Sequence, residues 1–550
     1  MFNIQLVAQS ARARIVGTVK DSQGAVLPGA TIIVTNTGTG VETRTTTDQG
    51  GSYQALELPI GSYKVKVQRA GFNTAETVAY TLEINQVQRI DVTLRVGKSE
   101  TVEVSGDAAQ VEVVNPTLGA SITSRPIVDL PLNGRNVLDL ALLEPGVTPH
   151  NNDDGSAGTY NIAGSRSDSV TFVLDGGVDN NLLSNGVVYT PNPDAVQEFR
   201  ILTSNYTAEY GRNAGGIISV VTKSGGNQLH GSIFEFNRND AFSANTYFNK
   251  KNSLPRDPLK RNQYGFAVGG PVKKDKVFWF ASYQGQKQTA GLSRTISTFT
   301  PEMLAGNFSH AGPGGTVDTN VAGFLLNNPF YQPNVALASQ GIIDPSRIDA
   351  VAKNYISKNL VAIAPNNAVP GSCDAFCSGT LNAQGSNIDD FNEFTARLDY
   401  NLSEKDHLNA TMGGRRIKQV RPLPAGGPGF PTVTIPHNYF SGLTYTHSFS
   451  PKLLSEFHFT LQRNAQDQAV PSSNLPTPAQ LGVGVTPDES TGPTRLGFSS
   501  GLVTGFSPQG PTALINNTFS YSDTFTWVKG RHTWKFGASY TPYQNNTVFD

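Results

Sequence analysis

At 550 residues the chain is too long for one ordinary core, so about three or four domains of 100 to 200 residues are expected. Charged residues make up 15% of it, against roughly 25% in typical soluble domains, while Gly (55), Phe (29) and Tyr (18) are abundant, which favours strands and turns. The net charge of -1 without any Lys/Arg-rich block excludes an electrostatic basis for nucleic-acid binding, and no apolar run reaches the roughly 18 residues that a spanning helix needs.

Residues 1–14 begin MFNIQLVAQS and end in small residues, as the cleavage zone of a secretory signal peptide does. We interpret them as the remnant of a signal peptide whose start is missing. The cysteines fit an oxidising compartment, because Cys373 and Cys377 lie close together in a Gly/Ser/Asn-rich segment that suits a local disulfide. Two ligands are too few for a metal site, and no cofactor is expected.

Residues 15–97 predict a small β-sandwich. Short β-branched runs alternate with Gly/Pro turns in IVGTVKDSQGAVLPGATIIVTNTGTG. In the later segment GSYKVKVQRAGF, Tyr63, Val65 and Val67 alternate with two lysines, as in a half-buried antiparallel strand. Several such strands at turn-limited spacing give a sandwich.

The order GTVKDSQGAVLPGATI, TTDQGGSY and LPIGSYKVKVQRAGF resembles the carboxypeptidase-regulatory-like domain, a transthyretin-like fold grouped with carbohydrate-binding-like sandwiches. The resemblance implies a structural spacer or a domain that contacts sugar or peptidoglycan. A zinc carboxypeptidase is not expected, because none of the eight histidines begins an H-x-x-E or H-E-x-x-H arrangement.

Residues 98–114 form an extended stretch of alternating polar and apolar residues that ends before Asn115-Pro116. Within it, ETVEVSG resembles the TonB box of TonB-dependent transporters, a segment that pairs as a strand with the periplasmic energy-transducing protein. The physical basis would be β-augmentation, in which backbone hydrogen bonds provide the affinity. A plain linker is the alternative. The candidate box consists of Glu100, Thr101, Val102, Glu103, Val104, Ser105 and Gly106.

Residues 115–226 predict an α+β domain. LPLNGRNVLDLALLEPGV places apolar residues at helical spacing over 137–142 before a Pro-Gly stop, which predicts a short helix. GSRSDSVTFVLDGGVDNN predicts the apolar strand Val170–Leu174, closed by an Asp-Gly turn. VQEFRILTSNYTAEYGRNAGGIISVVTKSGG predicts a strand, a glycine-rich loop and the strand Ile217–Thr222.

Taken in order, these three segments resemble the plug domain of TonB-dependent receptors, whose pattern runs LDG, I-E-V-x-R-G, YG and A-x-G-G-x-I-N-V-x-T-K. A regulatory-like sandwich ahead of the plug is similar to the Oar-like subgroup. The chain departs from the pattern at Ile201, where Gly is usual, and at Ser219, where Asn is usual. The matching plug residues are Leu174, Asp175, Gly176, Glu198, Arg200, Tyr210, Gly211, Arg212, Gly215, Gly216, Thr222 and Lys223.

A plug must satisfy many buried polar groups against a polar lumen. We therefore expect Glu198, Arg200 and Arg212 to form a salt-bridged lattice that holds the plug in the barrel wall without touching ligand. The glycines of the loop after Tyr210 are expected to serve tight backbone turns.

Residues 227–550 predict the N-terminal part of a transmembrane β-barrel. Within 391–402, Phe394, Leu398 and Tyr400 fall on one face, while Glu393 and Arg397 fall on the other, so that one face suits lipid and the other suits water. Strands of about ten residues follow from the same alternation elsewhere. Aromatic residues at their ends suit interfacial belts: Tyr439, Phe449, Trp527 and Tyr540.

The connections alternate between short turns, such as 403–406 and 450–452, and long polar excursions, roughly 239–261, 287–390, 417–437 and 464–516. Short periplasmic turns and long extracellular loops are the signature of outer-membrane barrels. About nine strands are expected, whereas plugged transporters have about 22, so the sequence is expected to be a fragment that shows a curved, open sheet beside the plug.

The fold expected is thus dominated by β-structure: a transthyretin-like sandwich, an α+β plug and a partial antiparallel barrel. The resemblance implies a TonB-dependent transporter of the outer membrane, energised by a TonB-type protein, with the sandwich and the start of the plug facing the periplasm. Its ligand would be an oligosaccharide, a peptide or a small protein. A surface adhesion protein without transport is the alternative, and no catalytic cluster suggests an enzyme.

Overall fold

A computed structural model describes most of the chain. The described residues are 12–97, 101–104, 117–149, 160–182, 185–211, 213–251, 255–358, 360, 379–422, 432–469, 476–484, 512–529 and 532–549. Among them, no helix combines the length and the apolar character that a membrane crossing requires.

The N-terminal domain is a sandwich of two sheets around one apolar core. The first sheet contains β1 (Ala13–Asp21), β4 (Ser52–Leu58), β8 (Val87–Arg89) and β9 (Val92–Leu94). The second contains β10 (Thr101–Val104), β6 (Thr74–Thr77), β5 (Gly61–Gln68), β2 (Thr31–Asn36), β3 (Glu42–Thr46) and β7 (Tyr80–Leu82). The predicted alternation in β5 is confirmed, because Tyr63, Val65 and Val67 are buried while Lys64 and Lys66 lie between them, half-exposed.

The plug is a five-stranded sheet with short helices packed on it. Its strands run in the order β11 (Leu118–Thr123), β16 (Val196–Ser204), β17 (Ile217–Thr222), β14 (Thr171–Leu174) and β15 (Gly177–Val178). The smaller elements are α1 (Ser124–Asp129), η1 (Val137–Leu143), β12 (Val147–Pro149), β13 (Tyr160–Ile162), η2 (Ser167–Ser169) and η3 (Pro193–Ala195). The predicted helix is present as the 3-10 helix η1, and the strand predicted at Ile217–Thr222 has those bounds.

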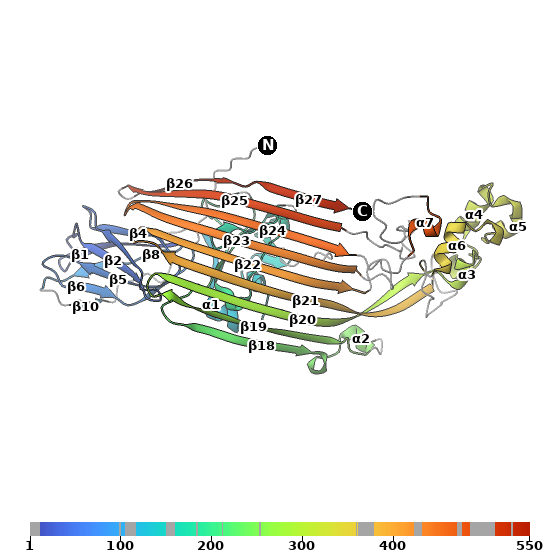
Figure 1. The fold of residues 1–550 in the computed structure, drawn as a ribbon, viewed down its shortest axis with the longest axis horizontal. Helices are drawn as coiled ribbons and strands as arrows, with labels where there is room; N and C mark the ends of the chain where they lie inside the picture. Colours follow the sequence, from blue (N-terminus) through green and yellow to red (C-terminus); the bar gives the residue numbers. More distant parts are fainter. Residues whose placement is uncertain are drawn as a thin grey trace.

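The C-terminal part is one antiparallel sheet in which neighbours in sequence are neighbours in space, from β18 to β26 (Figure 1). Its strands are β18 (His230–Asn239), β19 (Leu259–Lys273), β20 (Val277–Thr298), β21 (Gly379–Asn401), β22 (Asp406–Arg421), β23 (Thr432–Ser450), β24 (Leu453–Ala469), β25 (Thr512–Lys529), β26 (His532–Tyr540) and β27 (Tyr543–Phe549). Both β26 and β27 pair with β25, one after the other, so they occupy a single strand position.

The two faces of this sheet differ as the alternation predicts. On β21, Phe394 and Leu398 are exposed on the outer face, while Glu393 and Thr395 are buried against the plug. The aromatic residues expected at interfacial positions, Tyr439, Phe449, Trp527 and Tyr540, are all exposed. An apolar outer face and a polar inner face belong to a barrel wall between lipid and a wet lumen.

Most strands from β19 to β25 are much longer than the ten residues predicted from alternation. β20 has 22 residues and β21 has 23, and both extend into the region 287–390 that the sequence had suggested to be a loop. Alternation marks only the part of a strand that faces lipid. Where a hairpin rises beyond the membrane, both faces meet water and the pattern disappears.

Between the two strands, residues 301–357 form a small helical module where a loop was expected. It contains α3 (Pro301–Leu304), η5 (Pro313–Gly315), α4 (Thr319–Asn327), η6 (Gln332–Asn334), α5 (Val335–Ser339), η7 (Pro345–Arg347) and α6 (Ala350–Ser357). A second connection adds α7 (Pro478–Leu481), and Tyr355, Leu360 and Leu481 form a shared apolar cluster. Two separate loops therefore build one folded unit.

The sandwich lies at the end of the sheet where the strands are joined by short turns, and the helical module lies at the opposite end (Figure 1). Between β18 and β19, η4 (Asp240–Phe242) and α2 (Tyr247–Lys251) lie at the end that carries the long connections. The plug lies against the inner face of the sheet, and Phe440 of β23 belongs to the plug's own core cluster. The sandwich and the helical module thus lie at opposite ends of the molecule.

Candidate functional site

The centre of the site is the tight turn between β14 and β15. Asp175 and Gly176 both have positive φ, +48° and +85°, and connect Leu174 to its strand partner Gly177. Two successive left-handed residues are the geometry of a type I′ hairpin turn, for which Asp-Gly is a preferred sequence. The Asp-Gly turn predicted after Leu174 is therefore confirmed.

The Asp175 carboxylate joins the plug to the barrel wall. It accepts hydrogen bonds from the Thr222 backbone N–H at 2.8 Å and from the Thr222 hydroxyl at 2.7 Å, both within the plug. It also accepts one from the Thr411 hydroxyl of β22 at 2.7 Å and pairs with the Arg397 guanidinium of β21 at 3.2 Å. Arg397 in turn pairs with Asp399 at 2.8 Å. The buried charges are therefore paired and hydrogen-bonded, as burial requires.

The same turn fits closely against β24. A Cβ atom on Gly176 would lie 2.8 Å from Cε1 of His458, and one on Gly177 would lie 2.2 Å from Cγ2 of Thr460. The His458 ring is itself held by Glu456 at 2.8 Å and by Thr444 at 3.0 Å. Glycine at these two positions allows the plug backbone to touch the wall.

A second contact lies further from the sandwich. The Tyr189 hydroxyl donates to the Phe394 carbonyl oxygen at 2.7 Å and lies 2.8 Å from the Thr395 hydroxyl. Its ring covers Gly413 of β22, where an added Cβ would lie 2.2 Å from Cε1 of Tyr189. Shape and hydrogen bonding thus fix the plug to β21 and β22 together.

A third contact involves Arg135, which the sequence did not single out. Its guanidinium pairs with Asp194 inside the plug and donates from Nε to Gln284 of β20 at 3.0 Å. It also lies over the rings of Phe234 and Phe236 of β18, at 4.2 and 4.6 Å from their centroids. Arg135 has a φ of +58°, so its backbone is held in a conformation that few non-glycine residues adopt.

Glu198 and Arg200 both bond to the sandwich. The Glu198 carboxylate accepts a hydrogen bond from the Ile84 backbone N–H at 2.8 Å, and the Arg200 guanidinium donates to the Ile84 carbonyl oxygen. Ile84 belongs to the sandwich, so this pair meets the neighbouring domain where barrel-wall contacts were expected. Burial raises the pKa of Glu198 to about 7, despite hydrogen bonds from Ser121 and Ile84 that lower it. Arg212 lies outside the described residues.

The remaining plug residues lie around the sheet. The Tyr210 hydroxyl accepts a hydrogen bond from Asn85 of the sandwich, and Lys223 follows Thr222 with its backbone N–H bonded to Ala195. Gly211 comes directly before the undescribed position. Gly215 and Gly216 do not have left-handed backbones. Added Cβ atoms there would lie 2.5 Å from the Ser169 carbonyl oxygen and 2.4 Å from the Ile162 side chain, so close packing requires these glycines.

Part of the candidate box is described. Residues Thr101–Val104 form β10, which pairs in parallel with β6, Val102 opposite Ala75. This stretch is therefore an added strand of the sandwich sheet rather than a plain linker. Glu100, Ser105 and Gly106 lie outside the described residues, as do Cys373 and Cys377.

Three family models match the chain in the order of its three parts. A carboxypeptidase regulatory-like domain matches residues 14–95, a TonB-dependent receptor plug domain matches residues 120–217, and an outer membrane beta barrel domain matches residues 221–550. The barrel model alone covers more than half of the chain. The chain belongs to the TonB-dependent receptors of the outer membrane.

This receptor is similar to the TonB-dependent transporter Oar of Myxococcus xanthus, with 30% identity over 289 residues, which are 49% of the chain and 26% of the relative. Solved structures that it matches include the outer membrane transporter YddB from Escherichia coli (11% identity, TM-score 0.47, 78% of the chain and 48% of that structure). Another is the siderophore receptor PirA from Acinetobacter baumannii (14% identity, TM-score 0.44, 79% and 49%). The chain spans about half the length of these solved structures and about a quarter of the curated relative.

In the receptor, the contacts of Asp175, Tyr189 and Arg135 attach the plug to five strands of the wall, β18 and β20 to β22 through side chains and β24 through close backbone packing. These contacts are mostly polar. Polar contacts between two preformed surfaces are separable at lower cost than an apolar core, because water replaces the lost hydrogen bonds.

Proposed function

We propose that this receptor is an energised transporter, in which a periplasmic protein displaces or remodels the plug so that a ligand passes through the lumen. The observation that supports it most directly is the Asp175 turn, whose carboxylate binds Arg397 and Thr411 of the wall. A wall that evolved only for adhesion has no need of a plug bonded into its lumen. The long hairpins and helical module at the other end supply a surface for ligand capture.

The site at which the energy-transducing protein would act is β10 with its flanking residues, Glu100–Gly106. Among the described strands, β10 is at the end of the strand order in its sheet and its one neighbour is β6. A strand in that position can offer backbone groups to a further strand, which is the basis of β-augmentation. Its place between the sandwich and β11 of the plug means that a pull on it reaches the plug along the chain.

The ligand class that we propose is an oligosaccharide, a peptide or a small protein. The inner face of the wall is rich in amide side chains, some of which bond to the plug: Gln284, Gln286, Gln462, Asn464 and Asn516. Amides both donate and accept hydrogen bonds, which matches the hydroxyl groups of sugars and the backbone of peptides.

The test uses cells that carry the whole gene with residues Glu100–Gly106 deleted, beside the wild type and a gene knock-out. Each strain is given a mixture of oligosaccharides and peptides, and mass spectrometry follows what disappears from the medium. Compounds that the knock-out fails to consume should also remain with the deletion strain, yet still bind to its outer-membrane vesicles. Equal consumption by the deletion strain and the wild type would reject the assignment of the box.

A point variant sharpens the result. Val102→Pro removes a backbone N–H from β10, whereas Val102→Thr keeps both the N–H and the β-branched shape. The proline variant should lose binding to the periplasmic domain of the energy-transducing protein in a pull-down with the complete receptor. The threonine variant should retain it.

A further inference from the structure

The backbone of one sandwich residue is gripped from both sides by the plug. Ile84 donates its N–H to Glu198 at 2.8 Å and accepts from Arg200 at its carbonyl oxygen, so two side chains of β16 hold the backbone of one residue between them. Ile84 is fully buried, Glu198 is 2% exposed and Arg200 is 7% exposed. The bond from Arg200 is charge-assisted, and such hydrogen bonds are roughly twice as strong as neutral ones.

The segment that carries Ile84 is a rigid turn between β7 and β8. The Glu83 N–H donates to the Gln86 side chain at 2.8 Å, and the Gln86 N–H donates to the Glu83 carbonyl oxygen at 3.1 Å. Asn85, at a φ of +56°, donates its side-chain amide to the Tyr210 hydroxyl of the plug. A turn fixed in this way presents a preformed surface to the plug and loses little conformational freedom on docking.

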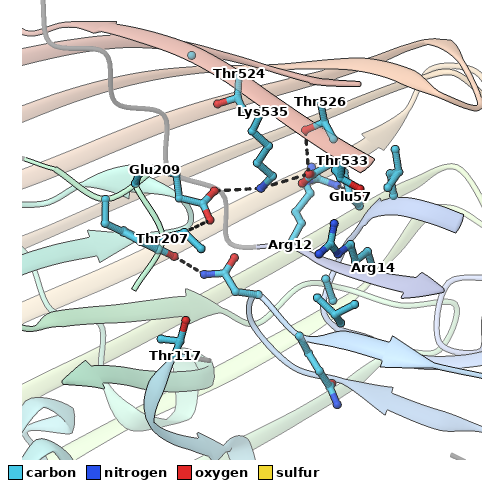
Figure 2. A pocket seen from close by; sticks show the side chains of 18 of the residues that line it. Arg12, Arg14, Glu57, Thr117, Thr207, Glu209, Thr524, Thr526, Thr533 and Lys535 are labelled. Atoms are coloured by element: carbon cyan, nitrogen blue, oxygen red, sulfur yellow. Dashed lines mark hydrogen bonds and ion pairs between the residues drawn. The ribbon is translucent and has the colours of Figure 1, made fainter. Parts of the chain in front are cut away.

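The sandwich also binds the wall, across a cavity of about 620 Å³ that all three domains line (Figure 2). Lys535 of β26 spans this cavity, at 3.0 Å from Glu209 of the plug and 3.8 Å from Glu57 of the sandwich. On another strand, Arg12, next to β1, pairs with Glu456 of β24 at 2.6 Å. The sandwich is therefore bonded to the plug and to the wall at once.

A third attachment lies at the turn between β19 and β20. Asn227, just after the plug, donates from its backbone N–H to Gly38 and from its side chain to Thr39, both at 3.0 Å. It also contacts Asp275 of the turn at 2.6 Å. The contacts of the sandwich thus reach from the first hairpin of the wall to β26.

We infer that the sandwich is a latch that keeps the plug in the barrel from the periplasmic side. The sandwich bonds to the plug and to the barrel wall, and separation of these two would open the lumen. The plug therefore leaves or rearranges only after the Ile84 contact breaks. The latch rests on the proposed function, because it regulates the movement of the same plug. Since β10 is a strand of the sandwich sheet, a partner that pulls on β10 loads the sandwich before it loads the plug.

The test measures KCl current through the complete receptor in a planar lipid bilayer, with urea added on the periplasmic side to loosen the plug. Arg200→Ala removes one side of the grip on Ile84. It should open at lower urea, and at a fixed urea concentration about tenfold more often, the change that one charge-assisted hydrogen bond supports. The matched control is Arg166→Ala, which removes an exposed plug arginine paired with Asp168 and should leave the opening unchanged.

A second measurement strengthens the attachment of the sandwich to the plug instead of weakening it. It does not depend on how well Arg200→Ala folds. Asn85→Cys and Tyr210→Cys, with the native cysteines of the complete receptor replaced by serine, allow a cleavable bismaleimide to join the sandwich to the plug. The joined receptor should need more urea to open, and dithiothreitol should restore the wild-type response.

The outcomes separate the two claims. A wild type that is silent without urea, with Arg200→Ala and the joined receptor both opening like the wild type, would overturn the latch alone. A wild type that conducts steadily without urea would overturn the gated transporter and the latch with it.

Discussion

Asp175 and Arg397 lie 222 residues apart in sequence and form an ion pair of 3.2 Å between the plug and the barrel wall. The contact links a two-residue turn to a strand that crosses the membrane. Because both side chains are nearly buried, removing one of them leaves the other charge buried and unpaired, which costs more than breaking a surface salt bridge.

Asp175→Ala should loosen the plug. It removes the acceptor of Thr222, Thr411 and Arg397 together, and bonds to a charged group contribute about 1.5–3 kcal/mol each, not additively. We expect a loss of about 3 kcal/mol in plug stability, measured by urea-dependent proteolysis of the plug in detergent. Asp168→Ala, at an exposed carboxylate of the same domain, should change it by less than about 0.5 kcal/mol. Equal losses would show that the wall contact is unimportant.

Two glycines with the same φ separate backbone strain from close packing. Gly176 and Gly146 both have a φ of +85°, but an added Cβ meets His458 at 2.8 Å in the first and nothing within 4 Å in the second. Gly146→Ala should cost only the strain of a left-handed residue, about 1–2 kcal/mol. Gly176→Ala should cost clearly more in thermal unfolding of the complete receptor. Identical costs would contradict the close fit of the plug against β24.

The docking of the sandwich on the plug should depend on pH through Glu198. Its pKa is raised from 4.5 to about 7 by burial, so the docked form holds a proton that the undocked form releases between these values. Docking is therefore strongest below pH 4.5 and weakens as the pH rises through 7, by up to about 3 kcal/mol. Glu83 opposes ionisation and Arg200 favours it.

The measurement is the protection of the 83–86 turn from protease at pH 5.5 and 7.5. Protection should be greater at pH 5.5 in the wild type, and Glu198→Gln should remove the difference while leaving a side chain of the same shape. A wild type with greater protection at pH 7.5 would reverse the sign and refute the prediction.

The helical module should come apart without damage to the barrel when its shared cluster is cut. Tyr355 and Leu481 are both buried and come from different connections, and Asn354 donates to the Leu481 carbonyl oxygen at 3.1 Å. Leu481→Ala should destabilise the module by about 2–5 kcal/mol. Hydrogen exchange should then increase in α6 and α7 but not in β20 to β24. Leu337→Ala on α5, which lies outside that cluster, serves as the comparison.

The sequence predicts those parts of the fold in which successive side chains alternate between two different surroundings. Alternation on β21 separates Leu398 from Arg397 because lipid and water lie on opposite sides of one strand. It cannot show the upper part of β20, where both sides meet water, and it therefore gave a loop there. The helices of the module were missed because they are short, although capping residues such as Thr300 and Asp349 precede them.

The contacts between domains were the least predictable. Glu198 and Arg200 were correctly singled out as buried polar residues, but both bond to the backbone of Ile84. Every residue has a backbone N–H or C=O, so the sequence does not indicate which residue will be such a partner. Asp175 was easier to predict, because the Asp-Gly sequence indicates both the type of turn and the carboxylate that it carries. The domain boundaries and the role of Glu100–Gly106 stay predictions.

The height of the β20–β21 hairpin has a consequence for the cell surface. A strand of 22 residues is about 70 Å long and, at a tilt of about 45°, rises about 50 Å, against about 30 Å for the hydrocarbon layer. α4 and α5 are therefore carried above the lipid headgroups. Antibodies and phages that approach the bacterium would then have access to these helices, and a peptide tag inserted between them would be displayed to the medium.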